Sequence, residues 1–164
     1  MSVRNITVSA SASGLSAAAS WLEGYANRLE KNVNELISAM LKEGEQYAID
    51  TLGHIDTGET VSSIMAYREG NTGLLVVGGN AIWIEFGTGV YAPGQTDHPK
   101  ASELGMSPHG TYGAGHGADP SGWYYQDDGG QWHHTMGIPS NRFFYNTAQM
   151  LRREYKRIAQ EVFG

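Results

Sequence analysis

Histidine and aspartate side chains gather in one long stretch of the sequence, and these residue types can bind divalent metal ions. Their spacing matches no compact zinc signature such as His-Glu-x-x-His, in which one helix face presents two imidazoles. The adjacent His133 and His134 would point to opposite sides of a strand. We therefore predict no metal site and no cofactor, and we keep a metal-dependent hydrolase as an alternative. The residues concerned are His98, His109, His116, His133 and His134, with Asp97, Asp119, Asp127 and Asp128.

The triplet Asp56-Thr57-Gly58 matches an aspartic-protease motif, in which two aspartates share one proton and activate water. Here the triplet follows a long predicted helix, where aspartate and glycine are ordinary turn residues. The glycine-rich run 113–117 neither follows a clear strand nor opens a helix with a lysine, so it does not indicate a phosphate site. No serine stands in a Gly-x-Ser-x-Gly pattern. We predict no catalytic residue and expect that the protein is not an enzyme.

Aromatic side chains flank the turn sequence 127–130, which predicts a projecting hairpin over about 122–135. Such aromatics can bind a sugar, anchor a protein interface or pack on the domain's own sheet. Arginines in the last helix form either a solvated face or a surface that pairs with acidic groups of neighbouring subunits. The interface candidates are Trp123, Tyr124, Tyr125, Trp132, Phe143, Phe144, Arg152 and Arg153.

The composition limits the classes of partner. The 164 residues fit one domain, 1–164, and a formal net charge of -6 argues against broad phosphate binding. The absence of cysteine excludes disulfides and cysteine-bound zinc and fits a reducing cytoplasm. No stretch approaches the roughly 20 consecutive apolar residues of a membrane span. We expect no membrane partner and no sequence-specific nucleic acid.

Apolar residues recur every three or four positions from about Ser16 to Leu52, which predicts one long amphipathic helix that could relax near Gly44. Gly53 is placed to end this helix in a left-handed conformation. A second amphipathic helix follows Ser140 or Asn141, either of which suits the N-cap position. The strands predicted outside the aromatic hairpin cover residues 3–9, 62–68 and 74–79, the last two forming a hairpin.

The segment Ala81–Phe86 is short and apolar, and it fits a strand or a helical turn equally. From Val90 to Ile138 no helical period survives, which indicates a connection unusually long for a compact domain. Such connections often carry function.

Three short sequence blocks follow one another along the chain, and their order is as informative as their residues. The first, 55–64, contains Asp56-Thr57-Gly58 and then Ser63-Ile64; the second, 81–89, ends in Glu85-Phe86-Gly87-Thr88-Gly89. The third, 122–148, contains the aromatic hairpin, Gly137-Ile138-Pro139 and Phe143-Phe144. In these blocks the chain resembles the tail-completion, or head-tail joining, family of lambdoid and related long-tailed bacteriophages. Thr60 stands where that family usually has leucine, and Thr147 where it often has proline.

This resemblance implies an α+β fold, in which a long N-terminal helix and a C-terminal helix pack on a small, mostly antiparallel sheet. It also implies a ring, typically six-fold, at the head-tail junction of the virion, assembled in the host bacterial cytoplasm. The expected partners are further copies of the chain, the tail tube protein and a head-completion or connector protein. We expect the motif residues of the first two blocks to shape the subunit body, while the insertion at about 91–121 and the hairpin reach a neighbour. A sugar-binding virion module is a further alternative.

Overall fold

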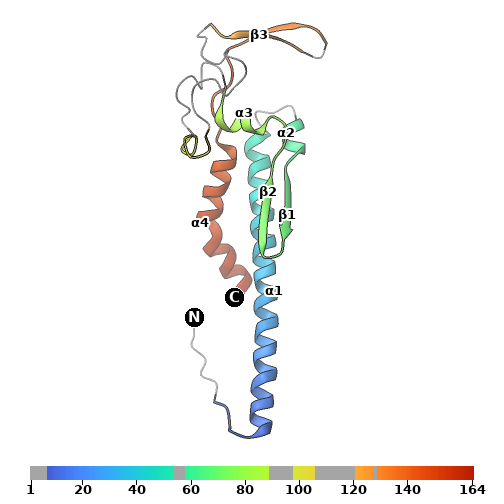
Figure 1. Cartoon of the computed structure of the whole chain (residues 1–164), viewed down its shortest axis with the longest axis vertical. Coiled ribbons are helices and arrows are strands. Elements are labelled where there is room, and N and C mark those ends of the chain that lie inside the picture. The colour runs from blue at the N-terminus through green and yellow to red at the C-terminus, as the bar shows by residue number, and fades with distance from the viewer. Residues whose placement is uncertain (1–6, 54–57, 89–97, 106–120, 128) are drawn as a thin grey trace.

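The computed structural model spans the whole chain and describes residues 7–53, 58–88, 98–105, 121–127 and 129–164. It has an α+β fold in which two long helices lie side by side with a small antiparallel hairpin beside them (Figure 1). The fold class predicted from the resemblance is therefore confirmed. The helices are α1 (Ala12–Leu52), α2 (Glu59–Ser62), α3 (Ala81–Phe86) and α4 (Phe143–Phe163), and the strands are β1 (Met65–Glu69), β2 (Thr72–Val76), β3 (Trp123–Gln126) and β4 (Trp132–Thr135).

Helix α1 is continuous over 41 residues and begins four residues before the predicted start. It begins there because Ser11, in extended conformation, accepts a hydrogen bond from the backbone N–H of Gly14 at 3.1 Å, as an N-cap residue does. The preceding residues 7–9 form no strand, and the rest of the predicted strand 3–9 lies outside the described residues. The predicted end was wrong in conformation. Gly53 is right-handed, with φ −58°, and its N–H donates to the carbonyl of Ile49 at 2.8 Å.

Helix α4 packs antiparallel to the C-terminal half of α1 (Figure 1). Gly44 of α1 lies at this contact, against Leu151 of α4. A Cβ atom on Gly44 would lie 3.0 Å from Cδ1 of Leu151. The sequence had suggested that the helix could relax near Gly44, but α1 is continuous there. The glycine instead permits close approach of the two helices.

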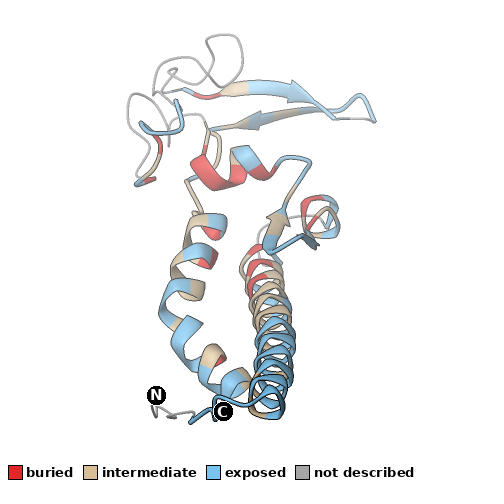
Figure 2. Ribbon diagram, turned by 60° about the horizontal axis from the view of Figure 1, so that its bottom comes forward, coloured by how far each residue is buried: buried red, intermediate tan, exposed pale blue. Residues whose placement is uncertain are grey.

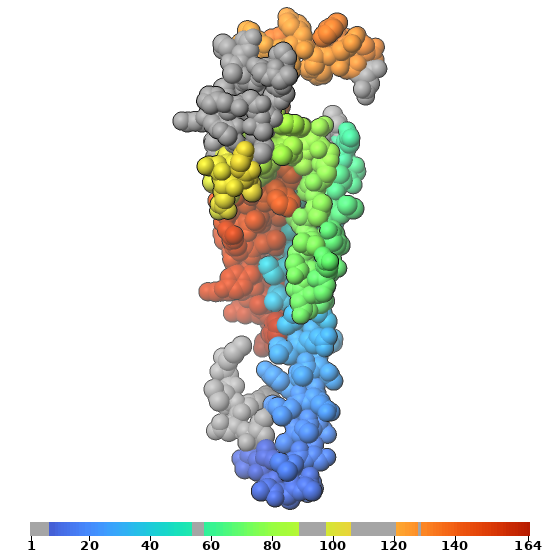
Figure 3. Space-filling model, in the orientation of Figure 1, coloured from blue at the N-terminus to red at the C-terminus, as the bar shows by residue number. Residues whose placement is uncertain are grey.

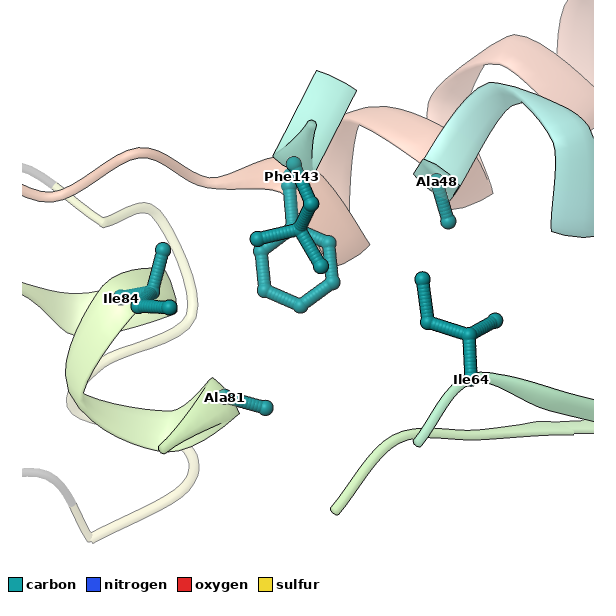
Figure 4. Close-up of a cluster of buried hydrophobic side chains, with 6 residues drawn as sticks. Ala48, Ile64, Ala81, Ile84 and Phe143 are labelled. Atoms are coloured by element: carbon teal, nitrogen blue, oxygen red, sulfur yellow. The ribbon is translucent and has the colours of Figure 1, made fainter. Parts of the chain in front are cut away.

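The hydrophobic core lies where the end of α1, the start of α4 and α3 meet (Figure 2). Side chains from these elements and from the residue before β1 point toward one another (Figure 4). Burial of apolar surface is the main stabilising contribution at this position. The buried residues are Ala48, Leu52, Ile64, Ala81, Ile84 and Phe143.

Strands β1 and β2 form the predicted hairpin, with Glu69 opposite Thr72 and a turn at Gly70-Asn71. Both strands are shorter than predicted. Strand β1 begins later than predicted, because Ser62 ends the helical turn α2 and Ser63 follows it as the capping residue. The hairpin lies along α1, and a Cβ atom on Gly73 would be 3.1 Å from side-chain atoms of Ile37 and Leu41. Strand β2 therefore sits directly on the helix.

The molecule is elongated, and its two ends differ from its middle (Figure 3). At one end the N-terminal half of α1 extends beyond α4 and the β1–β2 hairpin, and at the other end β3 and β4 project away from the long helices (Figure 1). The short segment Ala81–Phe86, which the sequence left undecided, is the helix α3. It connects the middle to the projecting end.

Candidate functional site

The predicted motif around Glu85 forms a buried joint between α3 and the start of α4. Both carboxylate oxygens of Glu85 accept backbone N–H groups of α4, from Phe144 at 2.8 Å and from Tyr145 at 2.9 Å. The backbone carbonyl of the same residue accepts the hydroxyl of Ser140 at 2.7 Å. A carboxylate at a helix N-terminus satisfies otherwise unpaired amides and interacts favourably with the helix dipole.

This arrangement corrects the predicted helix cap. Neither Ser140 nor Asn141 occupies the N-cap position of α4; Arg142 does, with φ 58°, and its side chain makes no capping hydrogen bond. The capping oxygen comes instead from Glu85, which is 59 and 60 residues away along the chain.

His98 pairs with Glu85 inside this joint. Its Nε2 lies 2.7 Å from Oε1 of Glu85, and both side chains are buried. The Nδ1 atom of His98 accepts the backbone N–H of Lys100 at 3.1 Å, so Nδ1 carries no proton and Nε2 donates to the carboxylate. The imidazole also packs against the ring of Phe86 at 4.2 Å between centroids and edge-on to Tyr145 at 5.5 Å. The pair thus attaches the start of the segment 98–105 to the joint.

A buried glutamate and histidine can form an acid–base pair, but these two are engaged with protein atoms. The carboxylate of Glu85 accepts hydrogen bonds from the imidazole and from the helix amides, and both ring nitrogens of His98 make hydrogen bonds. The hollow beside them, lined by Ile82, Glu85, Phe86 and Phe144 among others, has a volume of about 200 Å³. Ligand pockets commonly have about 300–1,000 Å³. The arrangement is suited to holding elements together.

The glycine of the same motif permits a second connection within the joint. Gly87 has φ 77°, and a Cβ atom there would lie 2.6 Å from the backbone nitrogen of Ser140. Next to it, the N–H of Thr88 donates to the carbonyl of Ile138 at 2.8 Å, and the N–H of Ile138 donates to the hydroxyl of Thr88 at 3.2 Å. The second and third sequence blocks therefore meet in space.

The first block contributes to the same body. The hydroxyl of Ser63 donates to the carbonyl of Thr60 at 2.7 Å and accepts the N–H of Gly78 at 3.0 Å, while Ile64 is in the core. Gly58 precedes α2 in the left-handed conformation. Of the predicted motif residues, Asp56, Thr57 and Gly89 lie outside the described residues.

The β3–β4 hairpin has the predicted position, and its aromatic residues divide between two faces. Tyr124 pairs with His134, and Trp132 with Gln126, which places Tyr124 and Trp132 on one face with exposed fractions of 69% and 65%. Trp123 is half-buried on the other face with Tyr125. The aromatic residues therefore project and do not pack on the other sheet.

The other face of the hairpin carries a hydrogen bond between a histidine and a carboxylate. Nε2 of His133 lies 2.7 Å from Oδ2 of Asp127, and Oδ1 accepts the N–H of Gln131 at 2.9 Å. The histidine, and then the backbone N–H, lower the pKa of the Asp127 carboxyl below its ordinary value. Across the strands, the carbonyl of Ser121 lies 2.7 Å from Nε2 of His134, so the two histidines point apart as predicted.

The structure describes only some of the histidines that were considered as metal ligands. His109 and His116 lie outside the described residues, and among the residues that the structure does describe, no group of three or more histidine, cysteine or acidic side chains could hold a metal ion. Sequence reasoning missed the pairing of His98 with Glu85, because the two residues are 13 positions apart and no local pattern connects them. No described helix combines the length and apolar character of a membrane span.

The remaining interface candidates differ in how far their side chains are buried. Phe143 is 1% exposed, so its prediction as an interface residue was wrong, because its ring fills the chain's own core. The neighbouring Phe144 is exposed, as are Arg152 and Arg153. Arg157 connects the two long helices through Glu43, with both carboxylate oxygens at 2.8 Å from Nη2.

Comparison of the chain with protein-family models, with curated proteins and with solved structures finds no match.

Proposed function

We propose that this protein is a structural subunit of a long-tailed bacteriophage, which forms a ring at the head-tail junction and joins the tail tube to the head without catalysing a reaction. In this proposal it is a tail-completion, terminator or neck protein, assembled in the bacterial cytoplasm. Its partners are further copies of itself, six in the ring, the tail tube protein and a head-completion or connector protein. The sequence blocks that resemble the tail-completion family motivate this assignment.

The observation that carries the proposal is the amount of apolar surface that a single chain leaves in contact with water. Many of the large exposed apolar residues lie at three separate places: the N-terminal half of α1, the outer face of the β1–β2 hairpin and the β3–β4 hairpin. Large apolar side chains that are exposed close to one another are typical of protein interfaces. The exposed apolar residues at these three places include Leu15, Leu22, Tyr25, Leu29, Met65, Tyr67, Val76, Tyr124, Tyr125 and Trp132.

The strand edges support the same conclusion. A two-stranded hairpin is only marginally stable alone in water and gains stability when a further strand or surface covers it. The β3–β4 hairpin has four residues in each strand and projects from the body. Neighbouring subunits in a closed ring would supply the missing contacts.

The joint around Glu85 explains why the resembling blocks belong together. It fixes the direction of α4 relative to α3 through hydrogen bonds, and one of them joins the buried side chains of His98 and Glu85. A ring closes only if each subunit presents its surfaces at fixed angles. We therefore assign the motif residues a shape-determining role.

Purified virions test this proposal. The protein is expected in intact particles, and bacteria infected with a phage that lacks its gene should accumulate separate heads and tails. Electron microscopy of the lysate and mass spectrometry of the particles give both results. Absence of the protein from particles, with normal joining in the deletion, would show that the proposal is wrong.

A second candidate function is sugar binding by the face that carries Tyr124 and Trp132, because exposed aromatic rings stack on sugar rings. A glycan array probed with the wild-type protein and with the Trp132→Ala variant tests it. Binding that the variant loses would favour this candidate.

A further inference from the structure

The N-terminal half of α1 presents an apolar stripe with the spacing of a helix-packing interface. Leu15, Leu22 and Leu29 recur every seven residues, and their exposed fractions are 61%, 56% and 45%. Apolar residues at seven-residue intervals are the pattern by which helices pack on other helices over several turns. Tyr25 occupies the position between two of these leucines on the same stripe.

The stripe widens through small residues. Ala18, Ala19 and Ala26 each follow one of the leucines by three or four positions, which places them beside the leucines on the helix surface. Small side chains let a neighbouring helix come close, and a wide stripe suits contact with more than one helix. The ring of Trp21 stacks on that of Tyr25, with centroids 5.6 Å apart, and extends the apolar surface on one side.

This stripe continues an interface that already exists within the chain. In the C-terminal half of α1, α4 covers the helix at Gly44 and Leu151, and Met40 lines the hollow between them. Helix α4 ends near the middle of α1, while α1 extends beyond it (Figure 1). The helix surface that α4 covers therefore continues as bare apolar surface, and another helix is the occupant that fits it.

Charged residues lie on the two sides of the stripe and not within it. At 3.6 residues per turn, Arg28 lies roughly 100° to one side of the leucines, and Glu23 and Glu30 lie roughly 100° to the other side. When identical parallel helices stand side by side around an axis, the acidic side of one helix faces the Arg28 side of the next. Residues 12–33 also carry Lys31, so two basic residues balance two acidic ones, which gives an anionic membrane no electrostatic attraction.

We propose that the N-terminal half of α1 is a self-assembly surface, through which α1 of one copy packs parallel to α1 of the next copy. The inference rests on the proposed ring, since rotational symmetry points every copy of α1 the same way. It adds to the proposed ring the segment that makes the contact between copies, the N-terminal half of α1, and the charged side chains that orient one α1 against the next.

The first experiment measures the mass of the full-length protein by analytical ultracentrifugation. Leu22→Glu combined with Leu29→Glu is expected to convert the oligomer to a monomer, while the circular dichroism spectrum stays unchanged because both side chains are exposed in the monomer. Ser20→Glu combined with Asn27→Glu is the matched control, with the same charge change and spacing on the opposite side of the helix. This control should remain oligomeric.

A charge exchange tests the direction of packing. Arg28→Glu is expected to weaken association at least tenfold, and adding Glu23→Arg and Glu30→Arg to the same chain should restore it. Because the chain has no cysteine, Leu29→Cys can also report proximity. Oxidation should crosslink parallel copies through this residue, whereas Asn27→Cys on the opposite side should not crosslink.

Several results would overturn the inference. A monomeric wild-type protein at all accessible concentrations, or a Leu22→Glu, Leu29→Glu variant that keeps the wild-type mass, contradicts it. Flotation of the monomer with phosphatidylcholine–phosphatidylglycerol vesicles would assign the stripe to a lipid surface instead. The proposed role in the virion is tested separately by the presence of the protein in particles, so either proposal can fail without the other.

Discussion

Nε2 of His98 donates to the carboxylate of Glu85 at 2.7 Å, and the same carboxylate accepts two backbone N–H groups at the start of α4. One buried side chain therefore connects α3, α4 and the segment that begins at His98. Because three donors depend on one negative group, its removal leaves all three without an acceptor. The energetic importance of the joint follows from this concentration of donors.

Glu85→Gln is expected to lower the free energy of unfolding by about 1–3 kcal/mol, because leaving a buried hydrogen-bond donor without its acceptor has a cost of this order. A glutamine offers one acceptor oxygen, and its amide nitrogen would face a donor. Urea unfolding followed by circular dichroism measures the change. Glu69→Gln, at an exposed carboxylate in β1, is the control and should have a negligible effect. Equal effects of the two substitutions would contradict the assigned role.

This joint also shows where sequence reasoning stops. Periodicity predicted α1, α4 and both hairpins, because apolar spacing and turn residues are local properties of the chain. The cap of α4 could not be predicted, since the residue that supplies it lies in another sequence block. Local rules favoured Ser140 or Asn141, whereas tertiary structure brings Glu85 to the helix amides.

The conformations of two glycines illustrate the same limit. A left-handed end at Gly53 was a reasonable expectation from residue type, but its φ is −58°. Gly44 suggested a weak point in the helix, whereas it is the place where α4 approaches. In both cases residue type indicated a special position, but the neighbours in space determined its role.

Gly44→Leu is expected to destabilise the protein by about 1–3 kcal/mol, because overpacking a closely packed contact has a cost of that order. The new side chain would meet Leu151, whose Cδ1 is only 3.0 Å from a Cβ atom at this position. Thermal unfolding measures the effect, and adding Leu151→Ala should recover part of the loss.

Gly24→Ala provides the comparison on the bare part of α1. The nearest atom to a Cβ there belongs to the side chain of Arg28, at 3.6 Å, so only helix propensity changes. That variant should be more stable by up to about 1 kcal/mol. If Gly44→Leu were as stable as the wild type, close packing of α4 on α1 would be refuted.

Gly87→Ala is expected to destabilise the protein more than Gly70→Ala does. Both glycines have positive φ, 77° and 57°, which costs a residue with a Cβ atom roughly 1–2 kcal/mol. Only at Gly87 would the new atom also meet backbone, 2.6 Å from the nitrogen of Ser140; nothing lies within 4 Å at Gly70. Chemical unfolding of the two variants measures the difference. Equal losses of stability in the two variants would mean that the backbone around Gly87 shifts to accommodate a Cβ atom at little cost.

The Asp127–His133 pair predicts a pH response in the β3–β4 hairpin. The imidazole and the N–H of Gln131 lower the pKa of the Asp127 carboxyl, so their stabilising effect is fully present above the ordinary value of 3.8 and is lost as pH falls through the lower, folded-state value. An NMR titration of the carboxyl carbon should give a midpoint below 3.8. His133→Ala should raise this midpoint, and an unchanged midpoint would contradict the dominant contribution of the histidine.

Substitution of Tyr124 and Trp132 by serine is expected to reduce the joining of heads to tails without lowering the stability of the isolated protein. Their side chains are largely exposed in the single chain, so their removal changes little in its folding, but a partner that buries them loses apolar contact. Truncation of a Trp or Tyr hot spot near the centre of an interface weakens binding by about 2 kcal/mol or more, which corresponds to roughly a 30-fold weaker association. Complementation of a gene-deletion phage, scored by counting free tails in electron micrographs, measures the effect. Tyr155→Ser, at an exposed aromatic residue in α4 outside the three proposed contact places, is the control and should leave joining unchanged. Normal joining by the double variant would remove the β3–β4 hairpin from the proposed contacts of the ring.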